Sequence, residues 1–579
     1  MKKIFETDNK IFTFDYEENV DIKFSLKSEK DGVVFYAVSF EWEKACAPKQ
    51  ITLSYSIPCV DTYTMWDPIE KLRFIPFGNK QLTDSRLASG MPLKGLLSRT
   101  GKNRYLSAVS DVKTPIVQRM RASITKATID CFIDFFTQMT GPFKSYEAEI
   151  RIDTRDIPFD GALYGARAWF DGLGYENAYV PEDAKYPMYS TWYSYGQAVT
   201  EGDVIAECEK AAKLGMKAVI LDDGWQTDDQ STIYGYCGDW KPIERKFPNM
   251  RAFSDKIHAL GMKVMLWFSV PFIGKFSENC STFEGKYLCY FDNTECYALD
   301  PRFKEVREFL VNTYVKAVKD WNLDGLKLDF IDRFKANGEY SDEMDFVSVE
   351  DAVEQLLKDV NSALREINPE ILIEFRQPYF GPVVSAYGNM MRVWDCPLDG
   401  CMNKNQTINL RLVSGSCAVH SDMIYWSRED TPEGVAVQLW GTLFSVPQIS
   451  ARLGNITDEQ KAVLKNYLDF WNEHRKTLSD SSLRVSFAEN GYGYAEAEGE
   501  DSIIALLCAS PIAEITKAKR SYYVNLTDSQ AIVIKNKSGK TLRVKVFDCM
   551  GRELANNTFD KDIFEIDSPV GSLTEVSFA

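Results

Sequence analysis

The sequence predicts a central (β/α)8 barrel flanked by an N-terminal and a C-terminal β-sandwich, a multidomain α/β and all-β fold. Between about residues 185 and 480, strand-like runs alternate with amphipathic helical stretches, as in a barrel of parallel strands. Short alternating runs with turn residues between them fill both flanks, which is typical of antiparallel sandwiches. At 579 residues the chain is also too long for one compact domain. We therefore expect domains at residues 1–165, 166–480 and 481–579.

The N-terminal part predicts a large antiparallel sandwich. Apolar and polar residues alternate in Lys10–Phe14, Gly32–Phe40 and Glu147–Ile152, and turn residues separate these runs. Such alternation favours strands with one buried face. An aromatic loop, Tyr63–Asp67, contains Trp66. A tryptophan in such a loop is more often packed than used, but we include Trp66 among the residues expected to contact a ligand.

The middle part predicts the barrel, whose active-site residues would lie at the C-terminal ends of the strands. Short apolar runs, as expected for buried parallel strands, alternate with stretches of helical periodicity. The expected strands are Met188–Tyr193, Lys217–Leu221, Lys263–Phe268, Gly325–Phe330, Ile371–Phe375, Met391–Trp394, Asp422–Tyr425 and Val446–Ile449. The expected helices include Asp203–Leu214, Met250–Leu260, Lys304–Trp321, Val349–Ile367 and Asp458–His474.

The last hundred or so residues return to short strands, for example Gly491–Ala497, Ser502–Leu507 and Lys540–Asp548. They predict a smaller β-sandwich. No internal repeat or low-complexity linker interrupts the chain.

Composition excludes several classes of protein. The formal net charge is −17 and no basic tract is present, which argues against a nucleic-acid partner. No apolar run is long enough to span a membrane, and the first residues lack the apolar segment of a secretory signal. Thirteen scattered cysteines and three histidines show no metal-ligand spacing. We therefore expect a cytoplasmic protein with reduced cysteines, no metal, no cofactor and no membrane association.

The stretch Asp324–Arg333 is the main indication of chemistry. In the expected strand, Lys327 and Asp329 share one face, because side chains two residues apart point the same way. A nearby ammonium lowers the pKa of a carboxyl group and keeps it ionised. An ionised, positioned carboxylate is what nucleophilic attack on a sugar requires. The alternative is a structural lysine–aspartate ion pair at a strand end.

Carboxylates and tryptophans follow the other expected strands. Such groups hold sugars, because ring faces stack on indoles and hydroxyls bind acidic oxygens. Asp222 and Asp223 directly follow the apolar run Ala218–Leu221, although Asp223 with Gly224 is also a turn signal. The other strand-end candidates are Trp192, Trp267, Arg392 and Asp395. We expect these groups to meet at one end of the barrel.

The order of these motifs resembles glycoside hydrolase family 36, the α-galactosidases or melibiases of clan D. The resemblance rests on Leu221–Trp225, Phe247–Met250, Ala259–Lys263 leading to Trp267, Asp324–Asp329, and Arg392 with Asp395. It implies retaining hydrolysis of a terminal α-galactoside in a carbohydrate substrate, and an oligomeric state of two or more chains is common in the family. By the same resemblance, Asp329 is the nucleophile, Asp395 the acid/base, Lys327 a donor to a sugar hydroxyl, Asp222 and Asp223 the partners of the 4- and 6-hydroxyls, Trp192 and Trp267 aromatic walls, and Arg392 a contact on the 2-position side.

Two departures from the family pattern leave alternatives open. Ile331–Arg333 replaces the usual asparagine–arginine pair, and the spacing in Trp394–Asp399 makes Asp399 a rival to Asp395 as the acid/base. We expect Trp394 and the Asp329 carboxylate to raise the pKa of Asp395. The alternative functions are an α-N-acetylgalactosaminidase, a galactosyl transferase on the same barrel and a non-catalytic sugar-binding protein.

Overall fold

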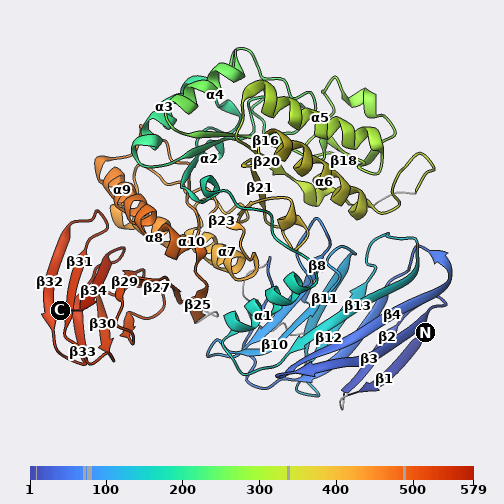
Figure 1. Ribbon diagram of the computed structural model, residues 1–579, viewed down its shortest axis with the longest axis horizontal. Coiled ribbons are helices and arrows are strands. Elements are labelled where there is room, and N and C mark those ends of the chain that lie inside the picture. Colours follow the sequence, from blue (N-terminus) through green and yellow to red (C-terminus); the bar gives the residue numbers. More distant parts are fainter. Residues whose placement is uncertain (8–9, 70–72, 75–80, 336–339, 487–490, 579) are drawn as a thin grey trace.

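The computed structural model describes residues 1–578 except 8–9, 70–72, 75–80, 336–339 and 487–490. A barrel forms the centre of the chain, and an all-β region lies on each side of it in sequence and in space (Figure 1). The expected fold class is confirmed. The exact domain limits near residues 165 and 480 stay predictions.

The N-terminal region is a sandwich of two antiparallel sheets. Its strands are β1 (Lys2–Thr7), β2 (Lys10–Asp15), β3 (Asp21–Lys30), β4 (Val33–Cys46), β5 (Ile51–Pro58), β6 (Thr64–Trp66), β7 (Arg73–Phe74), β8 (Gln81–Ser85), β9 (Leu93–Leu97), β10 (Asn103–Val109), β11 (Ile116–Ser123), β12 (Thr128–Phe135) and β13 (Phe143–Asp153). One sheet has the order β1-β2-β5-β12-β11-β8 and the other β3-β4-β13-β10-β9-β6-β7. Alternate residues such as Tyr36, Val38 and Phe40 are buried between them, as the period of two requires.

The barrel is a sheet of parallel strands that curls until its two edges meet. Its strands are β14 (Met188–Ser190), β15 (Ala218–Leu221), β16 (Lys263–Ser269), β20 (Gly325–Asp329), β21 (Leu372–Arg376), β22 (Met390–Arg392), β23 (Ala418–His420) and β24 (Gln448–Ile449). They follow the order β23-β22-β21-β20-β16-β15-β14-β24. A parallel bridge between His420 and Val446 joins the two edges.

The seventh strand is not where we expected it. The expectation was Asp422–Tyr425, but β23 is Ala418–His420, and Asp422 lies in the segment that follows. The error has a physical cause: Ala418–His420 and Asp422–Ile424 are both buried, so burial does not separate them, and backbone pairing with β22 decides which run is the strand. The correction places Asp422 beyond a strand end, where active-site groups gather.

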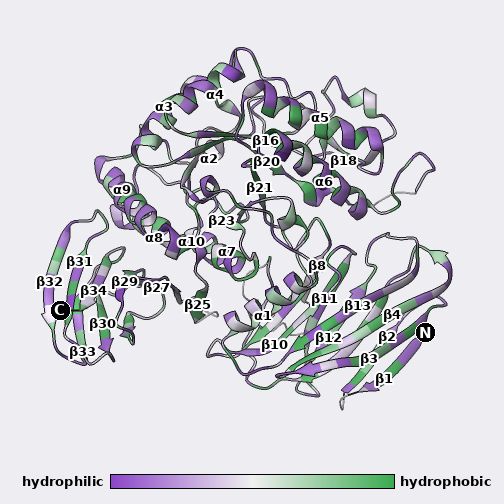
Figure 2. Ribbon diagram, viewed as in Figure 1, coloured by the Kyte–Doolittle hydropathy of each residue, from purple (hydrophilic) through white to green (hydrophobic). Residues whose placement is uncertain are grey.

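Most helices of the chain surround the barrel strands. The helices are α1 (Phe159–Gly172), α2 (Trp192–Tyr195), α3 (Glu201–Lys213), α4 (Met250–Ala259), α5 (Lys304–Trp321), α6 (Val349–Ile367), α7 (Gly400–Val413), α8 (Pro432–Gly441), α9 (Asp458–Glu473) and α10 (Arg475–Asp480). α3 to α9 lie around the barrel, whereas α1 contacts β10 of the N-terminal sandwich and α10 contacts the strands that follow the barrel. Figure 2 shows hydrophilic and hydrophobic residues on the same helices, as expected when one side faces the strands. Within the described residues, none of these helices is long and apolar enough to cross a membrane.

A small antiparallel sheet leaves the barrel after β16. Its strands are β17 (Phe272–Gly274), β18 (Tyr287–Phe291) and β19 (Cys296–Leu299), in the order β17-β19-β18. The backbone N–H of Val270, just before this sheet, donates to the carbonyl of Asp329 at 2.9 Å. The small sheet therefore begins beside the C-terminal end of β20.

The C-terminal region is a smaller sandwich. Its strands are β25 (Leu483–Ser486), β26 (Tyr494–Glu498), β27 (Ser502–Leu507), β28 (Ile512–Ile515), β29 (Arg520–Asn525), β30 (Ala531–Asn536), β31 (Leu542–Phe547), β32 (Glu553–Phe559), β33 (Ile563–Asp567) and β34 (Leu573–Phe578). The larger sheet has the order β25-β26-β27-β29-β34-β31-β32, and the smaller one β28-β30-β33. Side chains such as Ile534, Val544 and Val576 form the core between them.

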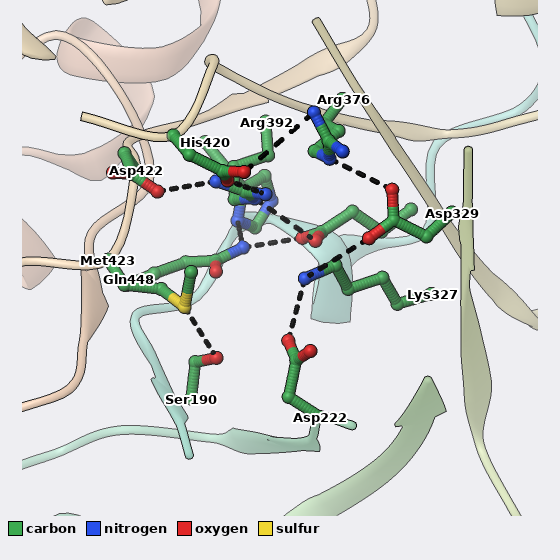
Figure 3. Close-up of polar contacts among 12 residues, drawn as sticks. Ser190, Asp222, Lys327, Asp329, Arg376, Arg392, His420, Asp422, Met423 and Gln448 are labelled. Carbon is green, nitrogen blue, oxygen red and sulfur yellow. Dashed lines mark hydrogen bonds and ion pairs between the residues drawn. The ribbon is translucent and has the colours of Figure 1, made fainter. Parts of the chain in front are cut away.

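The barrel interior changes from apolar to polar along the strands. At the N-terminal end, side chains including Met188, Ile220, Met265, Leu372 and Met390 form a small apolar core. Two residues further along several strands, the inward positions become polar, because alternate residues share a face. The polar inward residues include Asp222, Lys327, Arg392 and His420 (Figure 3), and Glu374, which lies beside Arg392. The apolar layer closes one end, and the polar groups gather towards the other.

Candidate active site

Asp329 lies at the C-terminal end of β20, and Figure 3 shows Arg376 and Lys327 beside its carboxylate. Oδ1 accepts from Arg376 Nε at 2.9 Å, from the backbone N–H of Phe330 at 2.8 Å and from the Tyr379 hydroxyl. Oδ2 accepts from Trp267 Nε1 at 3.0 Å. Burial alone would raise the pKa of Asp329, but Arg376 and Lys327 outweigh it and hold the pKa below its usual range. The carboxylate is therefore ionised and fixed in one orientation.

The backbone at Phe330 helps to hold Asp329. Phe330 has φ of +67°, a left-handed conformation that is unusual for a bulky residue. Its ring packs against Phe272, with centroids 5.0 Å apart, and against Tyr234 at 5.1 Å. These contacts offset the backbone strain. The same turn points the Phe330 N–H at the Asp329 carboxylate.

Lys327 connects Asp329 to Asp222 on the neighbouring part of the barrel wall. Lys327 Nζ donates to Asp222 Oδ2 at 2.6 Å and lies 4.0 Å from Asp329 Oδ2. All three side chains are buried. The expected inward pair of Lys327 and Asp329 is therefore present, and Lys327 pairs more closely with Asp222 than with Asp329.

Asp223 has a different environment from Asp222. Its two carboxylate oxygens accept from the side-chain amides of Gln226 at 2.6 Å and Gln197 at 2.8 Å. Burial raises the pKa of Asp223 to about 6, even though both amides favour the charged form. Asp223 is more than a turn signal, because its side chain is buried and hydrogen-bonded.

Arg392 lies among carboxylates in the barrel interior (Figure 3). Its guanidinium donates to Asp395 Oδ1 at 2.7 Å and to Asp422, and its Nε is 3.8 Å from Glu374. Asp422 also accepts from the Tyr193 hydroxyl at 2.9 Å. Arg392 is 1% exposed, so in this structure it positions Asp395. A contact between Arg392 and the 2-position of a sugar stays a prediction.

Asp395 follows β22 and is the more open of the two candidate catalytic carboxyls. Its side chain is 41% exposed, and Oδ2 lies 3.9 Å from Arg376, the arginine that also binds Asp329. Burial acts to raise the pKa of Asp395, but Arg392 and Arg376 dominate and the pKa lies well below its usual range. The expected rise in pKa is therefore wrong for the ligand-free protein.

Asp399 is the N-cap of α7. Its carboxylate accepts from the backbone N–H of Met402 at 2.8 Å, which is the usual role of aspartate at a helix start. The residue is exposed. The structure thus gives Asp399 a structural partner, whereas the partners of Asp395 are the two arginines of the site.

The aromatic residues are placed less uniformly. Trp267 is 1% exposed and contacts Asp329 through its indole nitrogen. Trp192 begins α2 just after β14 and is half-buried.

The expectation that Trp66 contacts a ligand is wrong. Trp66 is 1% exposed, and its indole N–H donates to Asn409 and Tyr492, each at 3.0 Å. It joins three parts of the chain, and its only donor is already used.

Four residues that contact the site were not predicted as part of it from the sequence: Arg376, Tyr379, Asp422 and Tyr193. The Arg376 position carried a signal, because it lies two residues after Glu374 on the inward face of β21. Tyr379 follows the strand in a loop, and a loop residue has no periodicity to reveal where it points.

Among the described residues, no group of three or more His, Cys, Asp or Glu is arranged to hold a metal ion.

Sequence comparison agrees with the geometry. The melibiase family model matches residues 182–329, which run from just before β14 to Asp329. The match takes in the barrel strands β14, β15, β16 and β20. The α-galactosidase Mel36A of Lactobacillus acidophilus is 35% identical over 131 residues, 21% of this chain and 17% of that protein. An A type blood α-D-galactosamine galactosaminidase of Flavonifractor plautii is 26% identical over 193 residues, 28% of this chain and 17% of that protein. These matches cover less than a fifth of the length of either relative.

Solved structures of melibiases share the whole architecture. A variant of the GH36 α-galactosidase AgaA from Geobacillus stearothermophilus, in complex with raffinose, superposes with a TM-score of 0.66 at 14% identity. The match covers 98% of this chain and 83% of AgaA. The α-galactosidase from Lactobacillus brevis gives a TM-score of 0.64 at 14% identity, over 100% of this chain and 83% of that one. At this identity the likeness shows the fold.

Proposed function

We propose that the protein is a retaining exo-glycosidase that releases terminal α-linked galactose from oligosaccharides or glycoconjugates by double displacement. The observation that carries the proposal is the pair Asp329 and Asp395 with Arg376 between them. One carboxylate is buried, ionised and immobile, and the other is partly exposed on the same barrel end. Two carboxyls of unequal environment are what this chemistry requires.

Asp329 acts as the nucleophile through Oδ2. Oδ1 already accepts three hydrogen bonds, from Arg376, Phe330 and Tyr379, so its lone pairs are engaged. Oδ2 accepts one hydrogen bond from Trp267 and has a lone pair left. Attack of Oδ2 on the anomeric carbon forms a glycosyl ester and expels the leaving group, and water later hydrolyses the ester. The donors on Oδ1 stabilise the carboxylate again when it leaves in the second step.

Asp395 acts as the acid and then as the base. A bound galactoside would cover its exposed side and exclude water, which raises the pKa of a carboxyl group. The proton is then given to the glycosidic oxygen as the bond breaks. Once Asp329 is an ester it no longer carries a charge, so the positive charge of Arg376 acts on Asp395 without competition. That lowers the pKa of Asp395 and favours its role as the base towards water.

Asp222, Asp223 and Lys327 recognise the sugar. The ammonium of Lys327 and the carboxylate of Asp222 form a buried donor and acceptor pair beside the nucleophile. Galactose hydroxyls can bridge such a pair, because each hydroxyl both donates and accepts. Asp223 keeps its geometry through Gln197 and Gln226.

The proposal is tested with Asp329→Asn, which keeps the size of the side chain and removes its charge. We expect a loss of several orders of magnitude in kcat on p-nitrophenyl α-galactoside, with little change in the free energy of unfolding. Azide should rescue Asp329→Gly by forming β-galactosyl azide, and should not accelerate the wild type. Near-normal activity of Asp329→Asn would rule out this residue as the nucleophile.

An α-N-acetylgalactosaminidase is the second candidate, because one matched relative is named for galactosaminide hydrolysis. A panel of p-nitrophenyl α-glycosides of galactose, N-acetylgalactosamine and glucose separates the two. We expect the highest kcat/KM with galactose. A preference for N-acetylgalactosamine would transfer the same two-carboxylate mechanism to that sugar. No turnover of any member would favour the non-catalytic sugar-binding alternative.

A further inference from the structure

Three tyrosines form a cluster on one face of the small sheet β17-β19-β18. The ring centroids of Tyr287 and Tyr297 are 4.4 Å apart and nearly parallel, and those of Tyr290 and Tyr297 are 4.6 Å apart. Tyr290 pairs directly with Tyr297 in the ladder, and a register shift lies between Tyr287 and Cys289. Such an irregularity re-aims a side chain. We call this group of three residues the tyrosine platform.

The tyrosine platform borders a hollow of about 560 Å³, within the range of roughly 300–1,000 Å³ for small-molecule sites. Lys275, Ser281 and Glu284 line the hollow together with Tyr287 and Tyr297. Tyr287 and Tyr297 are half-buried, whereas Tyr290 packs on Tyr297 outside the lining of the hollow and is 37% exposed. Aromatic rings beside hydroxyl, ammonium and carboxylate groups match a sugar, which presents an apolar ring face and a rim of hydroxyls.

The tyrosine platform is separate from the catalytic carboxylates. Phe272 of β17 stacks on Phe330 next to Asp329, and its neighbour Ile273 pairs with Tyr297. Side chains of successive residues point to opposite faces of a sheet. The platform is therefore on the face turned away from Phe330, while the sheet itself begins at the end of β20. A short galactoside in the barrel would not reach it, but a long chain could touch both.

We propose that the tyrosine platform is a second carbohydrate-binding site, which holds the backbone of a polysaccharide that carries α-galactosyl groups. This inference rests on the proposed function for the choice of ligand. A net charge of −17 argues against a polyanionic ligand at the same surface. Anchoring a long chain raises the local concentration of its galactosyl groups at the barrel.

The experiment measures binding and hydrolysis separately. Binding is the retardation of the intact protein in native gels that contain galactomannan, and hydrolysis is kcat/KM for galactomannan and for p-nitrophenyl α-galactoside. We expect Tyr290→Ala to weaken binding to galactomannan at least fivefold and to lower kcat/KM for it by a similar factor. The kcat/KM for the small substrate should stay within twofold. Tyr290→Phe keeps the ring and should bind within twofold of the wild type.

Tyr179→Ala is the matched control, because Tyr179 is 56% exposed and its hydroxyl bonds to Glu370, just before β21 at the other end of the barrel. The proposal is overturned if the wild type is not retarded, if Tyr290→Ala binds like the control, or if it loses activity equally on both substrates. It is also overturned if Tyr290→Ala changes only the oligomeric mass, since the surface would then contact a second copy. If the wild type is retarded but hydrolyses neither substrate, the binding site stands and the proposed function fails.

Discussion

Arg376 should set the pH range in which the enzyme works. Its Nε is 2.9 Å from Asp329 and its guanidinium is 3.9 Å from Asp395. Replacement by methionine removes a charge that lowers the pKa of both carboxyls. The nucleophile must be ionised, so a higher pKa of Asp329 moves the acid limb of the kcat profile to higher pH. The acid must be protonated, so a higher pKa of Asp395 moves the alkaline limb the same way. The whole bell-shaped pH profile should therefore shift to higher pH.

The size of this shift follows from the geometry. Two unit charges 4 Å apart interact with about 4 kcal/mol at an effective dielectric constant near 20. The Asp395 side chain is 41% exposed, so solvent screens much of this, and we expect a shift of about one pH unit in the alkaline limb. Loss of a charge-assisted hydrogen bond costs about 1.5–3 kcal/mol, or roughly ten- to a hundredfold in kcat at the optimum.

The assay is the pH dependence of kcat for methyl α-galactoside, whose unactivated leaving group needs the proton, and kcat reports the groups of the enzyme–substrate complex. Arg376→Lys is the matched control, because lysine keeps the charge but not the planar fork of donors. It should lose activity and keep both limbs close to those of the wild type. If Arg376→Met loses activity without moving either limb, Arg376 only supports the structure and the electrostatic argument is refuted.

Three further outcomes test the assignments. Asp395→Ala should hydrolyse activated aryl galactosides far better than natural galactosides, since a good leaving group needs no proton. Asp399→Ala should show no such selectivity and should lose about 1 kcal/mol of unfolding free energy in chemical denaturation, because the helix cap is missing. The reverse pattern would exchange the roles of the two residues. Trp66→Phe should lower the free energy of unfolding by about 1–3 kcal/mol, because Asn409 and Tyr492 lose a buried donor, and should leave kcat unchanged; a change in KM alone would return Trp66 to the binding site. Activity should survive exhaustive dialysis against EDTA, and a loss restored by a divalent ion would contradict the mechanism.

Most of the barrel could be predicted because its strands and helices have clear periods. The helices Lys304–Trp321 and Val349–Ile367 were expected with the bounds that the structure has. The seventh strand was misplaced by a few residues, since β23 is only Ala418–His420 and a more apolar run follows it. Hydropathy identifies buried residues, but here both runs are buried. Which run joins the sheet depends on backbone pairing, which hydropathy does not report.

The candidate site could be predicted in part for a similar reason. A strand of period two placed Lys327 and Asp329 on one face, and the structure shows both pointing inward (Figure 3). The pKa of Asp395 was misjudged because its partners Arg392 and Arg376 come from strand ends whose distance from Asp395 the sequence does not contain. Trp66 was misjudged because an aromatic loop looks the same whether a ligand or another domain covers it.

The N-terminal sandwich takes part in the geometry around Asp329, the proposed nucleophile. Arg86, just after β8, is fully buried and donates to the carbonyls of Asp332 and Phe334 in the segment that follows Asp329. Its charge is balanced by Glu350 of α6 at 2.8 Å. A few residues on, the N–H of Gly90 donates to the carbonyl of Pro378, next to Tyr379. One loop of the sandwich thus contacts two of the three segments that carry donors to Asp329. Because a buried arginine without these acceptors would be costly, docking of the sandwich on the barrel favours the arrangement seen around Asp329.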